Sequence, residues 1–267
     1  MTKSERREKI NMINKIRTKT KILLFDIEIS PSTGYSWRKF ETNIIEYTEE
    51  WYILCYTAKW LNNKKMTVSA LPQYKGRYRK SKVDDYDVVL SLWHLLDEAD
   101  VVIAHNADFD TKKANARFAF HGLKPPSPYK VICTLKVARK YFSFNSNRLD
   151  DLGEHLGLGR KIETNFSLWR GCMNGDMNSW RRMVRYNKQD VKLLEKVYLR
   201  MLPFISTHPN VNTLTKVNGS CPNCGSSNLQ KRGFAITGAT RKQRLQCISC
   251  GRWSQSIIKG EKGVDVR

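Results

Sequence analysis

Long apolar runs are missing from this 267-residue chain. No stretch of 18 consecutive apolar residues occurs, so the sequence predicts no membrane-spanning helix. The first 20 residues are basic but contain no apolar core, which argues against a secretory signal. Internal repeats and low-complexity tracts are also absent. The composition, 40% hydrophobic and 27% charged, is typical of a globular protein with one good-sized domain and room for a small module.

Acidic side chains are scarce. The chain has 25 Asp and Glu residues against 47 Lys and Arg residues, which gives a formal net charge of +22. A surplus of this size indicates a polyanionic partner, because Lys and Arg release counterions from phosphates. We expect that partner to be nucleic acid. Charge alone leaves two alternatives open, a merely soluble basic protein and a protein that binds acidic membrane.

The cysteines do not suggest a disulfide framework. Of the seven, four form two CxxC pairs, and Cys55, Cys133 and Cys172 are isolated in apolar or mixed surroundings. Metal binding in a reducing cytosol explains this pattern better than disulfides do. We expect the three isolated cysteines to be ordinary core or boundary residues.

Composition divides the chain into five segments. Polar residues with Pro and Gly follow Pro203 and are typical of a linker. We expect a basic arm at 1–20, an α/β domain at 21–205, a linker at 206–218, a cysteine-bearing module at 219–258 and a tail at 259–267.

The α/β domain is predicted to hold a mixed sheet of five strands flanked by helices, because strands gather at its front and then alternate with helices. The strands are expected at 22–29, 51–60, 64–71, 101–106 and 129–134. The helices are expected from Asp84 or Asp85 to Glu98 and at 110–121, 135–141, 149–156 and 179–202.

Two further predictions concern aromatic residues. The basic segment 72–83, which contains Tyr74 and Tyr78, is expected to be an exposed loop that either contacts nucleic acid or is simply solvated. The tryptophans Trp37, Trp60 and Trp169 are expected in the core rather than on the surface as stacking platforms for substrate.

Asp26 and Glu28 lie in the apolar run ILLFDIEI. Residues i and i+2 of a strand point to the same face, so these two carboxylates lie side by side. They repel each other unless a cation bridges them, and hard oxygen ligands of this kind suit Mg²⁺ or Mn²⁺. The alternative is a pair of solvent-facing acids, which the apolar residues on both faces of the strand disfavour.

Two more motifs supply acids. HNADFD ends in Asp110 just after a buried strand, where open α/β sheets place their sites, although Asp110 could instead cap the next helix. Phe109 is expected to pack inward. YNKQD places Tyr186 and Asp190 on one helix face at i and i+4, and taken alone this pair is a chance surface feature.

The ordered set DxE, NxxFD with a preceding His, and YxxxD resembles the DEDD superfamily of 3′–5′ exonucleases over residues 20–205. Tyr186 matches its tyrosine subclass, since position 185 is Arg rather than His. The chain looks closest to exonuclease-like proteins of bacteriophages that end in a zinc ribbon. Cys133-Thr134 stands where many relatives carry Asp-Thr, a departure outside the four metal ligands.

The resemblance implies an RNase H-like fold and a metal-dependent exonuclease in the cytosol of a bacterium or a phage-infected host. Asp26, Glu28, Asp110 and Asp190 would hold two Mg²⁺ or Mn²⁺ ions, which lower the pKa of the attacking water and stabilise the attacking and leaving oxygens. Tyr186 would orient that water. Asn106 would support the site or contact the substrate strand, and His105 is expected to be a satisfied boundary histidine. Single-stranded DNA is the favoured substrate, although no motif for 2′-OH contacts decides between DNA and RNA.

Cys221 and Cys224 form one CxxC pair and Cys247 and Cys250 the other, each followed by Gly. Four thiolates give a closed tetrahedral Zn²⁺ site that is structural rather than catalytic, and the segment between the pairs is typical of a hairpin. The module resembles a zinc ribbon; an iron–sulfur site and redox thiols are the disfavoured alternatives. Phe234 and Trp253 could stack on bases, but for Trp253 a place in the small core is at least as well supported. The residues expected to contact nucleic acid in this module are Lys231, Arg232, Arg241, Lys242, Arg244 and Arg252.

Two other functions remain open at this stage. One is a non-catalytic nucleic-acid-binding adaptor with a degenerate nuclease fold, which the intact acid set disfavours. The other is a structure-specific endonuclease or a recombinase on the same fold, prompted by the ribbon; the DxE opening and the YxxxD ending disfavour the recombinase.

Overall fold

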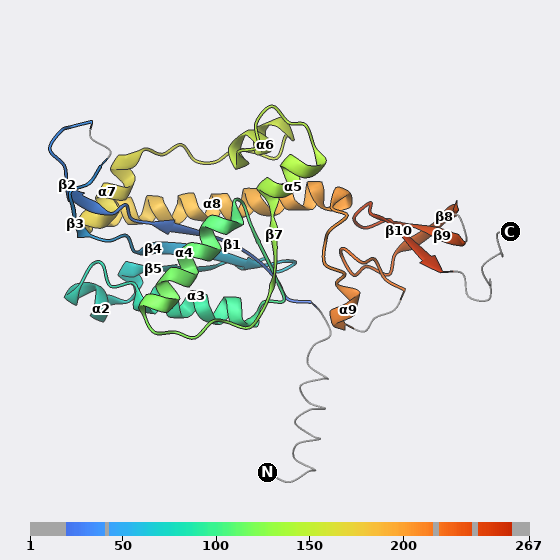
Figure 1. Cartoon of the computed structure of the whole chain (residues 1–267), viewed down its shortest axis with the longest axis horizontal. Helices are drawn as coiled ribbons and strands as arrows, with labels where there is room; N and C mark the ends of the chain where they lie inside the picture. The colour runs from blue at the N-terminus through green and yellow to red at the C-terminus, as the bar shows by residue number, and fades with distance from the viewer. Residues whose placement is uncertain (1–19, 41–42, 216–218, 237–239, 258–267) are drawn as a thin grey trace, which may run out of the picture. The chain divides into compact units, whose positions relative to one another are not determined.

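The computed structural model describes residues 20–40, 43–215, 219–236 and 240–257 (Figure 1). The predicted arm, apart from Thr20, and the predicted tail at 259–267 lie outside the described residues. The chain divides into two compact units, one at Lys21–Val197 and one that begins at Tyr198. None of the described helices is both long and apolar enough to cross a membrane.

The first unit contains the predicted mixed sheet of five strands, in the order β5-β4-β1-β6-β7. Its central strand β1 (Ile22–Ile29) pairs antiparallel with β4 (Ile53–Trp60) and parallel with β6 (Val101–Ala104). The outer strands are β5 (Thr67–Ala70), antiparallel to β4, and β7 (Lys130–Cys133), parallel to β6. The predicted hairpin between β4 and β5 is confirmed, and Asn62 in its turn has a left-handed φ of 68°, a conformation that Asn tolerates.

Side chains of β1 alternate between two environments. Leu23, Phe25 and Ile27 are buried in one apolar cluster with residues of α3 (Tyr86–Glu98) and α4 (Ala107–Phe120). The side chain of Asp26 points to the opposite face and accepts a hydrogen bond from Asn187 on α8 (Met177–Met201). Because alternate side chains of a strand point the same way, Leu24 and Glu28 lie on this face too. The sheet therefore holds the two acids against α8.

Helices α3 to α7 and the larger part of α8, up to Val197, also belong to this unit. The expected helices at 135–141, 149–156 and 179–202 are confirmed to within a few residues. The remaining elements after the sheet are α5 (Thr134–Tyr141), α6 (Leu149–His155) and α7 (Phe166–Asn174), and the sequence pattern does not predict the last of these.

The segment 72–83 is not a loop. It forms a 3-10 turn, η1 (Leu71–Gln73), followed by α2 (Lys75–Lys80). Tyr78 packs against the core, and its hydroxyl accepts a 3.0 Å hydrogen bond from Trp180 Nε1. Arg77 pairs with Asp84 and Asp87. Contacts with residues outside the helix thus hold a helix that local composition does not indicate.

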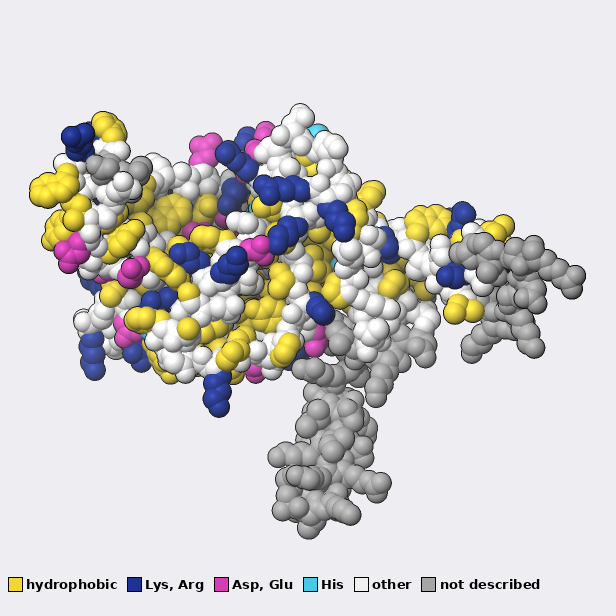
Figure 2. All heavy atoms as spheres, viewed as in Figure 1, with side chains coloured by type: hydrophobic (Ala, Val, Ile, Leu, Met, Phe, Trp, Pro, Cys, Tyr) yellow, Lys and Arg dark blue, Asp and Glu magenta, His cyan; other side chains and the backbone are white. Residues whose placement is uncertain are grey.

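The prediction that Trp37 lies in the core is wrong. Trp37 lies between β2 (Thr33–Tyr35) and β3 (Glu46–Glu49), a two-stranded hairpin that pairs only with itself, and 86% of its surface is exposed. Hydrophobic side chains gather over this hairpin at the upper left of Figure 2, because no second layer of described residues covers it. Trp60 and Trp169 do pack against the core, as expected.

The second unit contains a three-stranded antiparallel sheet in the order β10-β9-β8. The expected hairpin is formed by β8 (Leu229–Ile236) and β9 (Arg241–Cys247), and β10 (Trp253–Ile257) adds a strand that the sequence does not predict. Before this sheet come η2 (Leu202–Phe204) and α9 (Asn212–Thr215). The hydroxyl of Tyr198, in the last turns of α8, and Nε2 of His208 share a 2.9 Å hydrogen bond.

Candidate metal centres

Strand β1 and helix α8 bring three of the predicted acids together. One carboxylate oxygen from each of Asp26, Glu28 and Asp190 lies within 4.8 Å of the others. We call these three residues the carboxylate cluster. Asn187, one turn before Asp190 on α8, donates a 2.7 Å hydrogen bond to Asp26 Oδ2 and a 3.2 Å bond to the Asp26 carbonyl oxygen. The helix therefore both supplies an acid and orients one on the strand.

Asp110 borders the cluster without belonging to the group of three. It lies in the first turn of α4, is only 3% exposed, and its Oδ1 accepts a 3.2 Å hydrogen bond from the amide of Ile27. This amide lies between Asp26 and Glu28 along β1. Asp110 therefore faces the acid-bearing strand. The start predicted for this helix, at Asp110, is three residues late, because α4 begins at Ala107.

Tyr186 lies one turn of α8 before Asp190. Its ring packs edge-on against Trp169, with ring centroids 5.9 Å apart. Burial, followed by the charge of Asp190, raises the pKa of Tyr186 above its usual range. The phenol is therefore protonated at neutral pH, and can give and accept hydrogen bonds without acting as a strong base.

Lys161 is a site residue that no sequence motif indicates. It follows α6 in the chain, and its Nζ lies 2.7 Å from Asp190 Oδ2 and 5.1 Å from the centre of the Tyr186 ring. Burial alone would lower the pKa of Lys161, but the charge of Asp190 and hydrogen bonds to Asp190 and Tyr186 raise it above its ordinary value. Lys161 reaches the site only because the 157–165 segment packs against α8, which the sequence does not show.

The acids at this site are electrostatically strained. Burial, and then the charge of Asp190, raises the pKa of Asp26 to about 7. Burial and neighbouring carboxylates likewise raise the pKa values of Glu28 and Asp110, and burial raises that of Asp190 despite the nearby Lys161. A second cation would relieve this repulsion, and carboxylate oxygens are the donors that Mg²⁺ and Mn²⁺ prefer. The donor set therefore fits a divalent metal site.

The other residues of the HNADFD motif differ in burial and in contacts. His105 Nδ1 is 2.9 Å from Thr134 Oγ1, as befits the satisfied boundary histidine that was expected. Asn106 is exposed and adopts a left-handed φ of 63° just before α4. Phe109 does not pack inward as predicted: it is 42% exposed, with the Lys113 ammonium over its ring. The reason is that α4 begins early, so that Asp110 takes the inward position of this turn.

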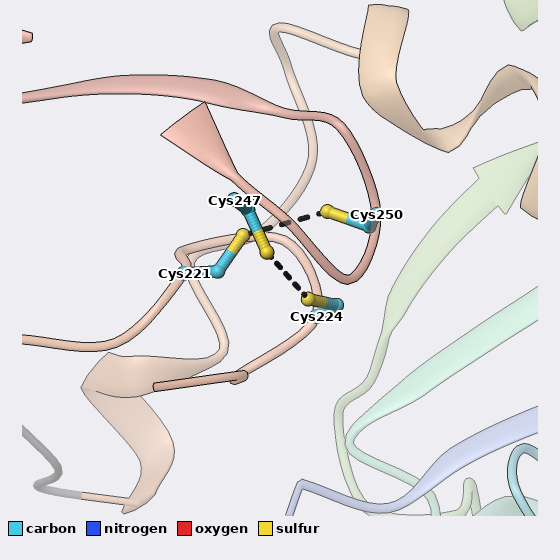
Figure 3. A group of neighbouring side chains, drawn as sticks. All are labelled: Cys221, Cys224, Cys247 and Cys250. Carbon is cyan, nitrogen blue, oxygen red and sulfur yellow. Dashed lines mark hydrogen bonds between the residues drawn. The ribbon is translucent and has the colours of Figure 1, made fainter. Parts of the chain in front are cut away.

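The four CxxC cysteines form a second cluster, in the C-terminal unit (Figure 3). Their sulfurs lie within 4.8 Å of one another, with 3.6 Å between Cys221 and Cys250 and between Cys224 and Cys247. All four are free thiols. A tetrahedron with Zn–S bonds of about 2.3 Å has sulfurs about 3.8 Å apart, so the spacing suits a structural zinc ion.

Matching turns build the cysteine cluster. The amide of Gly225 bonds to the Cys221 carbonyl and that of Gly251 to the Cys247 carbonyl, both at 2.8 Å. Both glycines have positive φ values, 73° and 80°, which a side chain would disfavour. The glycine after each CxxC pair thus lets the backbone fold tightly around the sulfurs.

The basic residues of this unit that were predicted to contact nucleic acid differ in exposure and in their contacts. Lys231, Arg232 and Arg244 are exposed, and Lys242 is half-buried. Arg241 is exposed, with its guanidinium 4.2 Å from the Phe234 ring centre. Arg252 donates to the Pro203 carbonyl at 3.2 Å, which commits it to holding this unit together.

Trp253 is not buried in a small core, since it is 47% exposed on β10. It lines a shallow pocket of about 370 Å³ together with Ala235, Arg244, Ser254 and Gln255.

Comparison with models of known protein families finds no match for this chain, and comparison with curated proteins finds none either.

Proposed function

We propose that the chain is a metal-dependent 3′–5′ exonuclease that hydrolyses nucleic acid, with single-stranded DNA as the favoured substrate. The observation that carries the proposal is the cluster of Asp26, Glu28 and Asp190 oxygens within 4.8 Å, with Asp110 beside it and Tyr186 on the same helix as Asp190. The mixed α/β sheet that holds these residues is consistent with an RNase H-like fold.

Asp26, Glu28, Asp110 and Asp190 would hold two Mg²⁺ or Mn²⁺ ions. When bound, such a pair supplies a water of lowered pKa and stabilises charge on the attacking and leaving oxygens of an in-line displacement. Asn187 fixes the rotamer of Asp26 for this task. Tyr186, protonated at neutral pH, orients the attacking water through its hydroxyl.

Lys161 adds a fixed positive charge beside Asp190 and Tyr186. A cation at this position attracts the phosphodiester and stabilises negative charge that develops on it. The net charge of +22 and the exposed cations of the ribbon would draw the polyanion to the chain. Free thiols and a structural zinc ion suit the reducing cytosol of a bacterium or an infected host cell.

The test is hydrolysis of 5′-labelled single strands by the purified full chain with Mg²⁺ or Mn²⁺. We expect a ladder of strands shortened from the 3′ end, and loss of at least a hundredfold in rate for Asp26→Ala/Glu28→Ala. Asp108→Asn is a matched control, because Asp108 is an exposed acid on the same turn of α4 as Asp110 and pairs with Lys136. Equal digestion by the wild type and the double variant would refute the proposal.

A circular single strand separates the remaining alternatives. An exonuclease leaves it intact, whereas an endonuclease on the same fold cuts it. Binding of linear strands without any hydrolysis in either metal would instead indicate a nucleic-acid-binding adaptor.

A further inference from the structure

The outer face of α8 carries a row of basic side chains. Arg181, Arg185, Lys188 and Lys192 are all exposed. At about 100° per residue they fall within an arc of about 60°, and at about 1.5 Å per residue they extend over about 16 Å. We call these four residues the α8 stripe. It is a continuous strip of positive charge on one element.

The stripe is not neutralised within the described part of the chain. None of its members forms an ion pair there. Arg181 donates only to the neutral Asn178, at 2.9 Å. The two acids of α8 are used elsewhere, Asp190 in the carboxylate cluster and Glu195 in an ion pair with Lys59.

The stripe also weakens the helix that carries it. Arg181 and Arg185 are four residues apart, as are Lys188 and Lys192, and like charges at this spacing repel each other. The repulsion would be relieved by an anion that spans several turns. Folding alone gives no reason for such an arrangement.

The stripe and the carboxylate cluster lie on different sides of α8. At about 100° per residue, the four basic residues lie about 140–180° around the helix from Asp190. A ligand on the stripe therefore occupies a surface separate from the one where Asp26 and Glu28 meet α8.

We propose that the α8 stripe is a second nucleic-acid-binding surface, which holds the sugar–phosphate backbone of a polynucleotide away from the carboxylate cluster. Evenly spaced, unpaired cations without a hydrophobic anchor suit a phosphodiester chain. The large hydrophobic residues of α8 that are exposed, Met177 and Leu199, lie beyond the two ends of the stripe, so none stands among its basic residues. Protein interfaces rely on apolar or aromatic anchors, and membrane-binding helices bury an apolar face in lipid, whereas the apolar face of α8 is in the core. The inference rests on the proposed function only for its choice of ligand.

The test is binding of labelled 30-nucleotide single strands and 30-base-pair duplexes, followed by fluorescence anisotropy over a range of salt concentrations. All proteins carry Asp26→Ala/Glu28→Ala, so that nothing is digested. Adding Arg185→Gln/Lys188→Gln/Lys192→Gln should weaken binding roughly tenfold or more at low salt. It should also reduce the slope of log K against log salt by about 2 for single strands and about 3 for duplexes, since each of three lost phosphate contacts contributes about 0.7 and 0.9, respectively. The ligand that shows the larger loss is the one that the stripe holds.

The matched control is Lys64→Gln/Lys65→Gln/Lys124→Gln. It removes the same charge from exposed positions of the same unit that do not belong to α8. Binding should change much less in this variant. Equal losses in the two triple variants, or unchanged binding in the stripe variant, would overturn the proposal. Thermal unfolding checks the fold: the stripe variant should melt no lower than its parent, because repulsion on α8 is removed.

A small substrate separates this proposal from the proposed function. With the carboxylates intact, the stripe variant should hydrolyse the p-nitrophenyl ester of thymidine 5′-monophosphate as fast as the wild type, and should need more of a long strand for half-maximal rate. If the wild type hydrolyses nothing but the stripe variant still loses binding, the proposed function fails and the stripe stands. If hydrolysis is normal and binding is unaffected by the stripe variant, only the stripe proposal fails.

Discussion

Among the described residues, Lys161 is the one cation that forms an ion pair with the carboxylate cluster. It partly offsets the repulsion that raises the pKa values of Asp26 and Glu28, since its charge lowers both. A bound divalent ion would take over that task. The contribution of this lysine to stability should therefore depend on whether metal is present.

We predict that Lys161→Met lowers the stability of the metal-free protein by about 2 kcal/mol, because Asp190 loses the partner of a largely buried pair. In Mn²⁺ the loss should be clearly smaller. Differential scanning calorimetry with and without the ion measures both values. Lys161→Arg, which keeps the charge, is the control. Equal losses in both conditions would show that Lys161 acts through packing on the Tyr186 ring instead.

His105 gives a prediction about pH. Burial, helped by the charges of Lys161 and Arg139, lowers the pKa of its imidazole to about 4. The unfolded chain binds the proton with a pKa of about 6.5, so this histidine's contribution to stability is fully present above pH 6.5 and is lost as the pH falls toward 4. At pH 5 the penalty amounts to about 2 kcal/mol.

Urea unfolding at pH 7.5 and pH 5.0 tests this prediction. The wild type should lose about 2 kcal/mol more than His105→Gln between the two pH values, because the variant has no buried imidazole to protonate. His94→Gln, at an exposed position of α3, should retain the wild-type difference. An identical pH response in His105→Gln and the wild type would contradict the assignment.

Single residues also show where sequence reasoning succeeds and where it stops. Strand periodicity alone places Asp26 beside Glu28. Only the resemblance of the ordered motifs to an exonuclease superfamily adds Asp190, and the structure does bring these three carboxylates together. Neither indicates Lys161, because its position depends on how the segment after α6 returns to α8. The prediction for Trp37 is wrong because its hydrophobicity says nothing about whether a second layer covers its hairpin.

At the scale of elements, the approach of α6 to α8 positions Lys161. Gly153 on α6 makes this approach possible: a Cβ there would lie 2.4 Å from the Gly159 carbonyl oxygen and 2.7 Å from Leu193 Cδ1. The backbone oxygen cannot move without shifting the 157–161 segment. Glycine inside a helix lowers stability by about 1 kcal/mol relative to alanine. We infer that the close packing at Gly153 outweighs this cost.

We predict that Gly153→Ala destabilises the protein by about 1–3 kcal/mol, despite its higher helix propensity. Gly76→Ala on α2 is the matched control. A Cβ at Gly76 would meet no described atom beyond its own helix and chain neighbours within 4 Å, so alanine should stabilise by about 0.5–1 kcal/mol. Urea denaturation of both variants measures the two effects. Stabilisation by both substitutions would mean that α6 has room to spare.

The elements themselves are predictable to different degrees. The strands of the five-stranded sheet follow from apolar runs and turn residues, and their expected positions agree with β1, β4, β5, β6 and β7. The sequence of helix α2, KGRYRK, is basic and contains Gly, which favours a loop, while its stabilising contacts with Asp84, Asp87 and Trp180 come from beyond the helix itself. Strand β10 lacks a strong pattern and forms by pairing with β9.

At the scale of the whole molecule, each of the two compact units carries a candidate metal site, and the two differ in chemistry. Thiolates in the unit that begins at Tyr198 suit Zn²⁺, and carboxylates in the unit at Lys21–Val197 suit Mg²⁺ or Mn²⁺. A chelator that binds zinc strongly and magnesium weakly, such as 1,10-phenanthroline, should therefore act on one unit alone.

We predict that phenanthroline in the presence of Mg²⁺ unfolds the cysteine-bearing unit and leaves the five-stranded sheet folded. The reason is that a small structural zinc unit draws much of its folding free energy from the metal, whereas the sheet has its own apolar core. Limited proteolysis should then cleave after about residue 205 and leave a resistant fragment.

Cys224→Ser should reproduce this pattern without chelator. Cys172→Ala, a buried cysteine on α7, should lower only the melting transition of the sheet unit. Loss of both units in a single transition on zinc removal would show that the sheet depends on the ribbon for its stability.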